Sequence, residues 1–592
     1  MAAHSQRPLN NSTNDLVRQA YYERYPTCDP PILSRFGKFR RGSSRYASGK
    51  IFILFNRFSS VRLVLIGALA LFALLAMAYL GSIELRASRN ASITGDEPFY
   101  LLTTQSLLHD GDLDLSQQYQ QGSYQSFFDH PDGLWKQSAQ LDNGVLLSPH
   151  NPGLSIMLIP GYAIGGLRGT QVQLLLIAAF TFALTYILVT RITEEYLWSW
   201  LAVAAVGLSP SAFVYATEVY PEMPAAFLLI ASLLVIQSTG LTGDKRALQD
   251  DQKVIEANSS GRSDPVEGYS THTGLGLGKL ATSRYFAILP LSWRALLLAT
   301  LLTAMLWLGV KYTPLAGLVT LWALWRMEPR DRVALLISGV VSAVFFTWFH
   351  LRTYGTLTPY SVGLVYAGEP ALAVLAQHFG FADRAYRLIG LFIDQRFGLG
   401  HWAPVLLIAL PATGLLRRGG SVSRLVLALI GAQLLIATFL AVTMMGWWFP
   451  GRTMITVLPL FALPMALLLM RLPTWGRLAV GLMGLHTLAI TAALAIAGHT
   501  NEITIAVDPF NMKAPLFQVT SPIFPDYRHW TIQTWLLTGV WSSAAVCSAA
   551  WAFNLPLSFG RAKLRRLGNY LAQVRKPGFG NFVMLVYCLK CL

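Results

Sequence analysis

The sequence has few charged residues and few cysteines. Charged residues make up 13% of the 592-residue chain, whereas soluble domains usually carry about 25%. Together with 53% hydrophobic residues, this excludes a set of ordinary soluble domains and favours a membrane protein. The four cysteines offer no disulfide framework. Cys588 and Cys591 have the spacing of half a zinc site, but no second pair completes it, so metal or redox chemistry is not expected there.

Acidic residues are fewer than basic ones, which gives a formal net charge of +16. The basic residues gather in the two tails and in alternate loops, as Lys and Arg do on the cytoplasmic side of membrane proteins. We therefore expect basic cytoplasmic tails at 1–60, where the chain is predicted to be disordered, and at 553–592. These tails are expected to face lipid rather than nucleic acid.

Long hydrophobic runs take up most of the chain, and their length is that of helices that span a bilayer. They predict an all-α integral membrane bundle of about 12 transmembrane helices within 61–552, interrupted by a disordered cytoplasmic insert at 239–292 that is rich in Gly, Ser, Asp and Lys. The predicted spans lie near 61–82, 171–190, 197–214, 222–238, 293–310, 312–326, 333–351, 401–416, 424–445, 453–470, 477–497 and 532–552.

Two adjacent acids, Asp96 and Glu97, stand in the first predicted outer loop, about 83–170. Pro98 is tolerated in the first turn of a helix, so a short interfacial helix is expected to begin here and to end near Gly111. Acids at this position cap a helix and favour its positive end. The alternative is chemistry, because a carboxylate can take the proton of a sugar hydroxyl as that hydroxyl attacks an anomeric carbon.

Five segments, in order along the chain and all on the predicted outer face, resemble those of GT-C glycosyltransferases, in the branch related to protein O-mannosyltransferases and lipid A aminoarabinose transferases. The resemblance covers about residues 60 to 500. The segments are Gly95-Asp96-Glu97-Pro98 with 110–114; Asn151-Pro152-Gly153-Leu154 with 160–162; Thr217-Glu218-Val219-Tyr220-Pro221-Glu222; Asp394-Gln395-Arg396-Phe397-Gly398-Leu399; and Gly446-Trp447-Trp448-Phe449-Pro450-Gly451-Arg452.

The resemblance implies a GT-C bundle with a long first extracytoplasmic loop that carries interfacial helices. It implies a polyprenyl-phosphate sugar as donor, inversion at the anomeric carbon, and Asp96 as general base, with Glu97 orienting the acceptor or helping to hold a cation. It also implies basic residues that bind the lipid phosphate, for which Lys311, Arg396 and Arg452 are the candidates. Some relatives use a divalent ion; because ligands cluster only at Asp96 and Glu97, we expect no required metal and no other cofactor.

Isolated cations on an outer face need an explanation, because such segments are poor in Lys and Arg. Lys311 lies between two apolar spans, where a phosphate or a carboxylate would offset the cost of burial. Arg396 and Arg452 can bind phosphate oxygens through two N–H groups. The alternatives are side chains that reach the head-group layer and ion pairs, such as one between Asp394 and Arg396.

Three further residues are candidate contacts to the acceptor or the sugar. Glu218 and Glu222 flank Tyr220-Pro221 in an outer turn, although helix capping explains Glu222 equally well. His150 could act at the head group, or could be incidental. Three tryptophans could stack on a sugar or belong to the interfacial aromatic belt: Trp402, Trp447 and Trp448.

The sequence thus predicts a multi-pass glycosyltransferase of the plasma (inner) membrane, with both termini in the cytoplasm and a role in cell-envelope glycan. A lipid or glycan acceptor is favoured over a protein. A transporter or flippase of lipid-linked sugars is the main alternative, since about twelve spans suit one; transporters, however, usually place ionisable groups at mid-membrane. A non-catalytic assembly partner with the same fold is the third.

Overall fold

The computed structural model describes residues 44–137, 140–141, 143–238, 291–361 and 381–554, and most of these residues are helical, with two isolated β-bridges and no strand. The longer helices are α2 (Ser44–Leu80), α3 (Glu97–His109), α5 (Gly153–Thr193), α6 (Tyr196–Gly207), α8 (Glu222–Ser238), α10 (Leu291–Leu308), α11 (Thr313–Arg326), α12 (Pro329–Tyr354), α19 (Ser421–Leu435), η7 (Arg452–Phe461), α21 (Thr474–His499) and α23 (Ile532–Asn554).

Shorter helical segments connect these elements. They are α4 (Ser116–Gln120), η1 (Ser123–Ser126), α7 (Pro210–Tyr215), η2 (Val310–Tyr312), η3 (Pro359–Ser361), α15 (Phe381–Arg384), α16 (Arg387–Ile393), α17 (Leu399–Trp402), η4 (Pro404–Ile408), α18 (Ala409–Ala412), η5 (Thr413–Arg418), η6 (Ile436–Leu440), α20 (Ala462–Leu469), η8 (Pro509–Asn511), α22 (Pro515–Thr520) and η9 (Ser521–Ile523).

Six helical segments of the described chain are long and apolar enough to cross a membrane, and three shorter apolar helices accompany them. The predicted all-α, multi-pass membrane class is confirmed at this level. The predicted spans at 312–326 and 532–552 coincide with α11 and α23, whereas 401–416 is a series of short helical turns broken by Pro404 and Pro411. The count of about twelve spans stays a prediction.

The chain divides after Val61 into two units. In the first unit the described residues are the beginning of α2, which starts at Ser44, inside the segment predicted to be a disordered tail. Everything below concerns the second unit. Of the other regions predicted to be disordered or basic, 1–43, 239–290 and 555–592 lie outside the described residues, and so do Cys28, Cys588 and Cys591.

The helix α5 is two helices that fold back on each other. Gly165 and Gly166 leave the helical conformation, and Gly166 has a φ of +55°. The Gln173 amide accepts a hydrogen bond from the Gly161 N–H (2.8 Å) and donates one to the Met157 carbonyl (2.7 Å). In a straight helix Met157 and Gln173 would be roughly 24 Å apart. The predicted loop to about 170 therefore contains a helix at 153–164.

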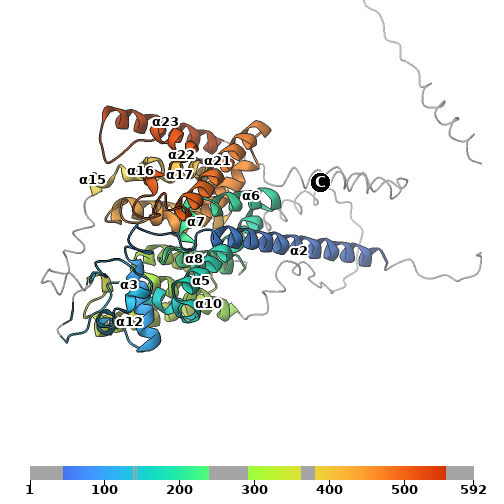
Figure 1. Cartoon of the computed structure of the whole chain (residues 1–592). Helices are drawn as coiled ribbons and strands as arrows, with labels where there is room; N and C mark the ends of the chain where they lie inside the picture. The colour runs from blue at the N-terminus through green and yellow to red at the C-terminus, as the bar shows by residue number, and fades with distance from the viewer. Residues whose placement is uncertain (1–43, 138–139, 142, 239–290, 362–380, 555–592) are drawn as a thin grey trace, which may run out of the picture. The chain divides into compact units, whose positions relative to one another are not determined.

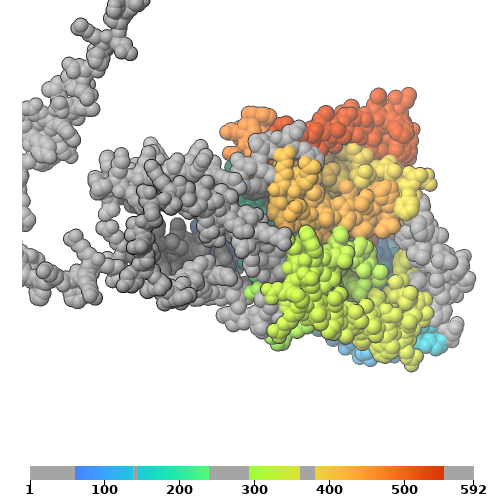
Figure 2. All heavy atoms as spheres, turned by 180° about the vertical axis from the view of Figure 1, so that it is seen from behind, coloured from blue at the N-terminus to red at the C-terminus, as the bar shows by residue number. Residues whose placement is uncertain are grey.

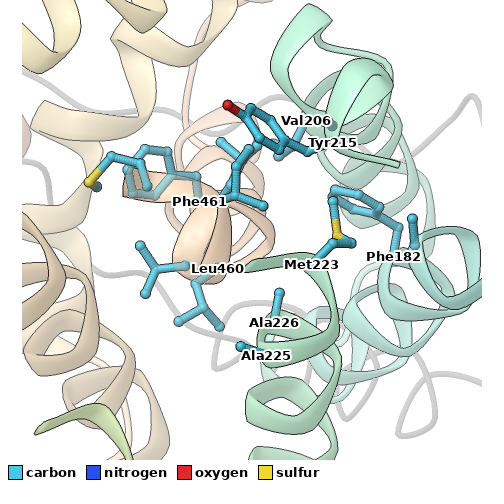
Figure 3. Packing of buried hydrophobic residues seen from close by; sticks show 14 of the residues in the cluster. Phe182, Val206, Tyr215, Met223, Ala225, Ala226, Leu460 and Phe461 are labelled. Carbon is cyan, nitrogen blue, oxygen red and sulfur yellow. The ribbon is translucent and has the colours of Figure 1, made fainter. Parts of the chain in front are cut away.

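The core lies where α5, α8 and η7 meet. Figure 1 shows α5, α8 and α10 side by side, and Figure 3 shows Phe182 of α5 and Met223 of α8 packed near Leu460 and Phe461. Small buried residues of α8, such as Ala225, allow neighbouring helices to pack closely. This core sets the beginnings of α8 and η7 against each other.

A second group of helices follows the insert. On the face shown in Figure 2, residues 291–361 form the light green surface, beside the orange surface of later helices. The end of α10 also packs closely on the beginning of α5, because a Cβ added to Gly153 would lie 2.3 Å from the Trp307 carbonyl oxygen. His150, just before α5, and Lys311, just after α10, are thereby brought to the same region.

Candidate functional site

Four charged side chains from four separate segments form one network. The Arg452 Nη2 group donates to the Asp96 Oδ2 atom at 2.8 Å, and its Nε group donates to the Glu222 Oε1 atom at 3.0 Å. Lys311 Nζ lies 2.7 Å from the same Glu222 oxygen. Two carboxylates thus balance two cations. The sequence singled out all four residues, and the structure brings them together; we call them the central cluster.

Two glycines with positive φ values directly precede two of these charged residues. Gly95 has a φ of +61°, and an added Cβ would lie 2.7 Å from the Tyr220 hydroxyl; Gly451 has a φ of +94°. Such φ values favour glycine. Each glycine directly precedes a charged residue of the central cluster, Asp96 or Arg452.

Asp96 does not cap the helix that follows it. The residue occupies the N-cap position of α3, but its side chain makes no capping hydrogen bond. Burial alone would raise the pKa of this carboxyl, yet Arg452, His150 and the hydrogen bond from Gln137 hold the pKa well below its usual range. With a quarter of its side chain exposed, Asp96 is an ionised carboxylate that a ligand can reach.

Glu97, its neighbour, has a different setting. Its side chain is buried, and its two carboxylate oxygens accept the backbone N–H groups of Thr94 (3.0 Å) and Val219 (2.9 Å). Burial raises the pKa of Glu97 from 4.5 to about 7, against these hydrogen bonds and the charge of Arg452. Glu97 therefore joins the first loop to the 218–220 turn through these hydrogen bonds, and its catalytic role stays a prediction.

Glu218 and Glu222 also differ from each other. Within the described residues neither carboxylate oxygen of Glu218 has a hydrogen-bond partner. Burial and the charge of Glu97 raise the pKa of Glu218 well above its ordinary value, so it is held protonated. Glu222, at the first turn of α8, pairs with Lys311 and Arg452, so its side chain serves the central cluster rather than a cap.

The cations of the central cluster also contact aromatic rings. The Arg452 guanidinium carbon lies 3.9 Å from the centre of the Tyr220 ring and 5.1 Å from that of Trp448, distances that favour cation–π attraction. Lys311 has a side chain that is 48% exposed, compared with 10% for Arg452. Lys311 is therefore the more accessible cation.

His150 joins this group from the end of the first loop. Its Nε2 atom lies 3.8 Å from Asp96 Oδ1 and 2.8 Å from Gln137 Oε1, while Gln137 donates to Asp96 Oδ1 at 3.1 Å. The His150 ring stacks on Tyr100 at 4.7 Å between centroids. Sequence reasoning missed Gln137, since a lone glutamine in a polar loop carries no pattern that would select it.

Arg396, the third candidate phosphate ligand, belongs to a different group. Its guanidinium lies over the Phe510 ring at 5.0 Å, and among the described contacts no hydrogen bond or ion pair joins it to the central cluster. The carboxylate of Asp394 does not pair with this guanidinium either. It accepts the backbone N–H groups of Arg396, Phe397 and Tyr527.

The tryptophans are in three different surroundings. Trp402 is fully buried, and its indole N–H donates to the Arg396 carbonyl at 2.7 Å, so it belongs neither to an interfacial belt nor to an open sugar platform. Trp447 is 63% exposed, and Trp448 contacts Arg452. Among the described residues no group of three or more His, Cys, Asp or Glu side chains is arranged to hold a metal ion.

An apolar cavity of about 430 Å³ opens between α5, α10 and α12. Its hydroxyl groups are partly satisfied, since Thr303 donates to Ser342 at 2.9 Å. Gly153, three residues after His150, and Leu308, three residues before Lys311, line it. The other lining residues are Ile156, Met157, Leu296, Ala299, Thr300, Ala304, Trp307 and Ser338.

Comparisons with known proteins do not assign a function to this chain. No family model matches the chain, and no curated protein does. A solved structure, that of ArnT from Cupriavidus metallidurans in the apo state, aligns with a TM-score of 0.41 and 14% identity over 82% of this chain and 77% of that one. A TM-score this low does not establish a shared fold.

Proposed function

We propose that this chain is a membrane glycosyltransferase that moves a sugar from a polyprenyl-phosphate donor to an acceptor hydroxyl on the extracytoplasmic face, with inversion. The observation that carries the proposal is the Arg452 guanidinium, which binds the accessible carboxylate of Asp96 through one nitrogen and Glu222 through another. An ionised, reachable acid beside two cations is what such a transfer needs from a protein.

The proposed step conserves charge within the site. The acceptor oxygen forms a bond to the anomeric carbon, and its proton goes to Asp96, which becomes neutral. The bond between the anomeric carbon and the phosphate oxygen breaks, and its electron pair leaves with the phosphate. The departing phosphate gains one negative charge as Asp96 loses one. Arg452, which is paired with Asp96 before the step, can then stabilise the phosphate instead.

Lys311 is the proposed first contact of the donor phosphate. Its side chain is half exposed and its partner Glu222 is shared with Arg452, so an incoming phosphate can compete for it. The apolar cavity beside Gly153 and Leu308 is of a size typical of ligand pockets, and its position suits the first isoprene units. A lipid or glycan acceptor, and a plasma-membrane location with both termini in the cytoplasm, complete the proposal. We also propose that the reaction needs no metal.

The test uses purified protein in lipid, a panel of polyprenyl-phosphate sugars and a membrane extract as the acceptor source. Release of free polyprenyl phosphate is compared among wild type, Asp96→Asn and Asp132→Asn. Asp132 is a matched control, because it is an acid of the same loop with a side chain 91% exposed. We expect Asp96→Asn to lower release by about 10²- to 10⁴-fold with an unchanged melting temperature, and Asp132→Asn to have no effect.

Three results would contradict the proposal. Release that is equal in wild type and in Asp96→Asn would remove Asp96 as the base. No release with any donor, from protein that moves lipid-linked sugars between leaflets, would replace the transferase with a flippase. Binding of the donors without release or movement would indicate a non-catalytic partner.

A further inference from the structure

One side chain, that of Gln137, links Asp96 to His150. Gln137 bridges them: its amide nitrogen is 3.1 Å from Asp96 Oδ1 and its amide oxygen 2.8 Å from His150 Nε2. An ionised carboxylate only accepts hydrogen bonds, so the amide nitrogen must face Asp96. The amide oxygen then faces the imidazole, and His150 must carry its proton on Nε2.

His150 is held in place independently of these hydrogen bonds. Its ring stacks on Tyr100, and its side chain is 14% exposed. Burial lowers the pKa of His150; Asp96 and Glu222 oppose the shift, whereas Arg452 and Lys311 reinforce it. Burial therefore favours the neutral imidazole, and its Nε2–H group is the donor to Gln137.

The consequence is that the Asp96 carboxylate is held from both sides. Arg452 binds Oδ2 and Gln137 binds Oδ1. Each oxygen has two lone-pair directions, so one direction on each remains for another donor. Two fixed hydrogen bonds on different oxygens also fix the plane of the carboxylate, which directs the remaining lone pairs.

We propose that Gln137 and His150 are positioning residues, which hold the Asp96 carboxylate so that a free lone pair meets the acceptor hydroxyl. The inference rests on the proposed transferase function and assigns roles to two residues outside its catalytic step. His150 orients the amide of Gln137, and that amide orients Asp96. Neither residue exchanges a proton with substrate.

Four variants test whether Gln137 and His150 position Asp96. His150→Phe keeps a ring on Tyr100 but removes the donor, and Gln137→Met keeps the length of the side chain but removes both amide groups. We expect each to lower kcat about tenfold, with little change in donor KM, because a misplaced base affects the reacting geometry. The double variant should be no worse than either single one, since both break the same chain. His150→Gln, which retains a donor, should recover part of the rate.

A second measurement does not depend on turnover. The carboxyl stretching band that Asp96→Asn abolishes is followed by infrared spectroscopy during acid titration in wild type, Gln137→Met and His150→Phe. Protonation of Asp96 should move to higher pH in both variants, because Gln137→Met removes the amide donor and His150→Phe removes the group that orients it. If wild type proves inactive with every donor, the proposed function fails, and this titration still decides whether Gln137 and His150 position Asp96.

Three outcomes would contradict the proposed positioning of Asp96 by Gln137 and His150. Multiplicative losses in the double variant would mean that the two residues act separately. A rise in donor KM with constant kcat would make them binding residues. An unshifted Asp96 titration in folded Gln137→Met protein would show that the amide does not hold the carboxylate.

Discussion

Two groups of acids and arginines, both from segments that the sequence placed on the outer face, differ in what their carboxylates bind. In the central cluster, Asp96 and Glu222 bind the side chains of Arg452 and Lys311. In the second group, Asp394 is fully buried and binds three backbone N–H groups. A carboxylate that satisfies the backbone holds loops together. One that shares a cation with another acid, and remains reachable, is available to a ligand.

The largest difference in activity is expected between variants of Arg452 and of Arg396, both of which the sequence predicts to bind the lipid phosphate. Arg452→Lys removes a guanidinium that binds two acids through two nitrogens, and an ammonium cannot reproduce that geometry. We expect release of polyprenyl phosphate to fall by about 10²-fold. Arg396→Lys, the matched change over the Phe510 ring, should alter release less than about twofold. Equal losses would mean that both groups serve the reaction.

A smaller effect is expected in the cavity between α5, α10 and α12. Ala304→Phe would fill space at its wall and exclude about two methylene groups of the donor, worth about 0.8 kcal/mol each. The KM of polyprenyl donors should therefore rise about tenfold, and that of a donor analogue without isoprene units should not. Leu336→Phe, at an exposed position of α12, is the control. A KM shift that is independent of chain length would place the lipid elsewhere.

The smallest effect is expected at Glu97, which adjoins Asp96 but, like Asp394, binds backbone N–H groups. Burial raises its pKa to about 7 from 4.5, so folding favours the protonated form. Its contribution to stability is present in full below pH 4.5 and is lost as pH rises through 7. The melting temperature of wild type relative to Glu97→Gln should thus fall by a few degrees between pH 4.5 and 8. A difference that grows with pH would reverse the assignment.

Much of the fold could be predicted, because hydropathy reports burial in lipid directly. The acids of the first loop were also found, since polar residues are conspicuous there, and α3 begins at Glu97 and ends at His109, close to the predicted Gly111. The hairpin within α5 was missed: apolar residues continue on both sides of Gly165 and Gly166, so the hydropathy does not change at the turn.

The composition of the site was only partly predictable for a different reason. Arg396 and Arg452 have similar local sequences, each following an apolar outer segment, and only tertiary contacts separate them. Gln137 contributes through one hydrogen bond to a residue 41 positions away and another to a residue 13 positions away, and neither leaves a periodic signal. Which candidate residues are in contact depends on how segments far apart in the sequence pack together, and residue type alone does not predict this.

The ion pair between Asp96 and Arg452 joins residues 356 positions apart, and this has a consequence for biosynthesis. At 5–20 residues per second, Arg452 follows Asp96 out of the ribosome after roughly 20 to 70 s. Until then Asp96 and Glu222 are acids without their shared counter-ion. Under the proposed function, the site is complete only when almost the whole bundle has been inserted, so a nascent chain would not act prematurely on a lipid-linked sugar.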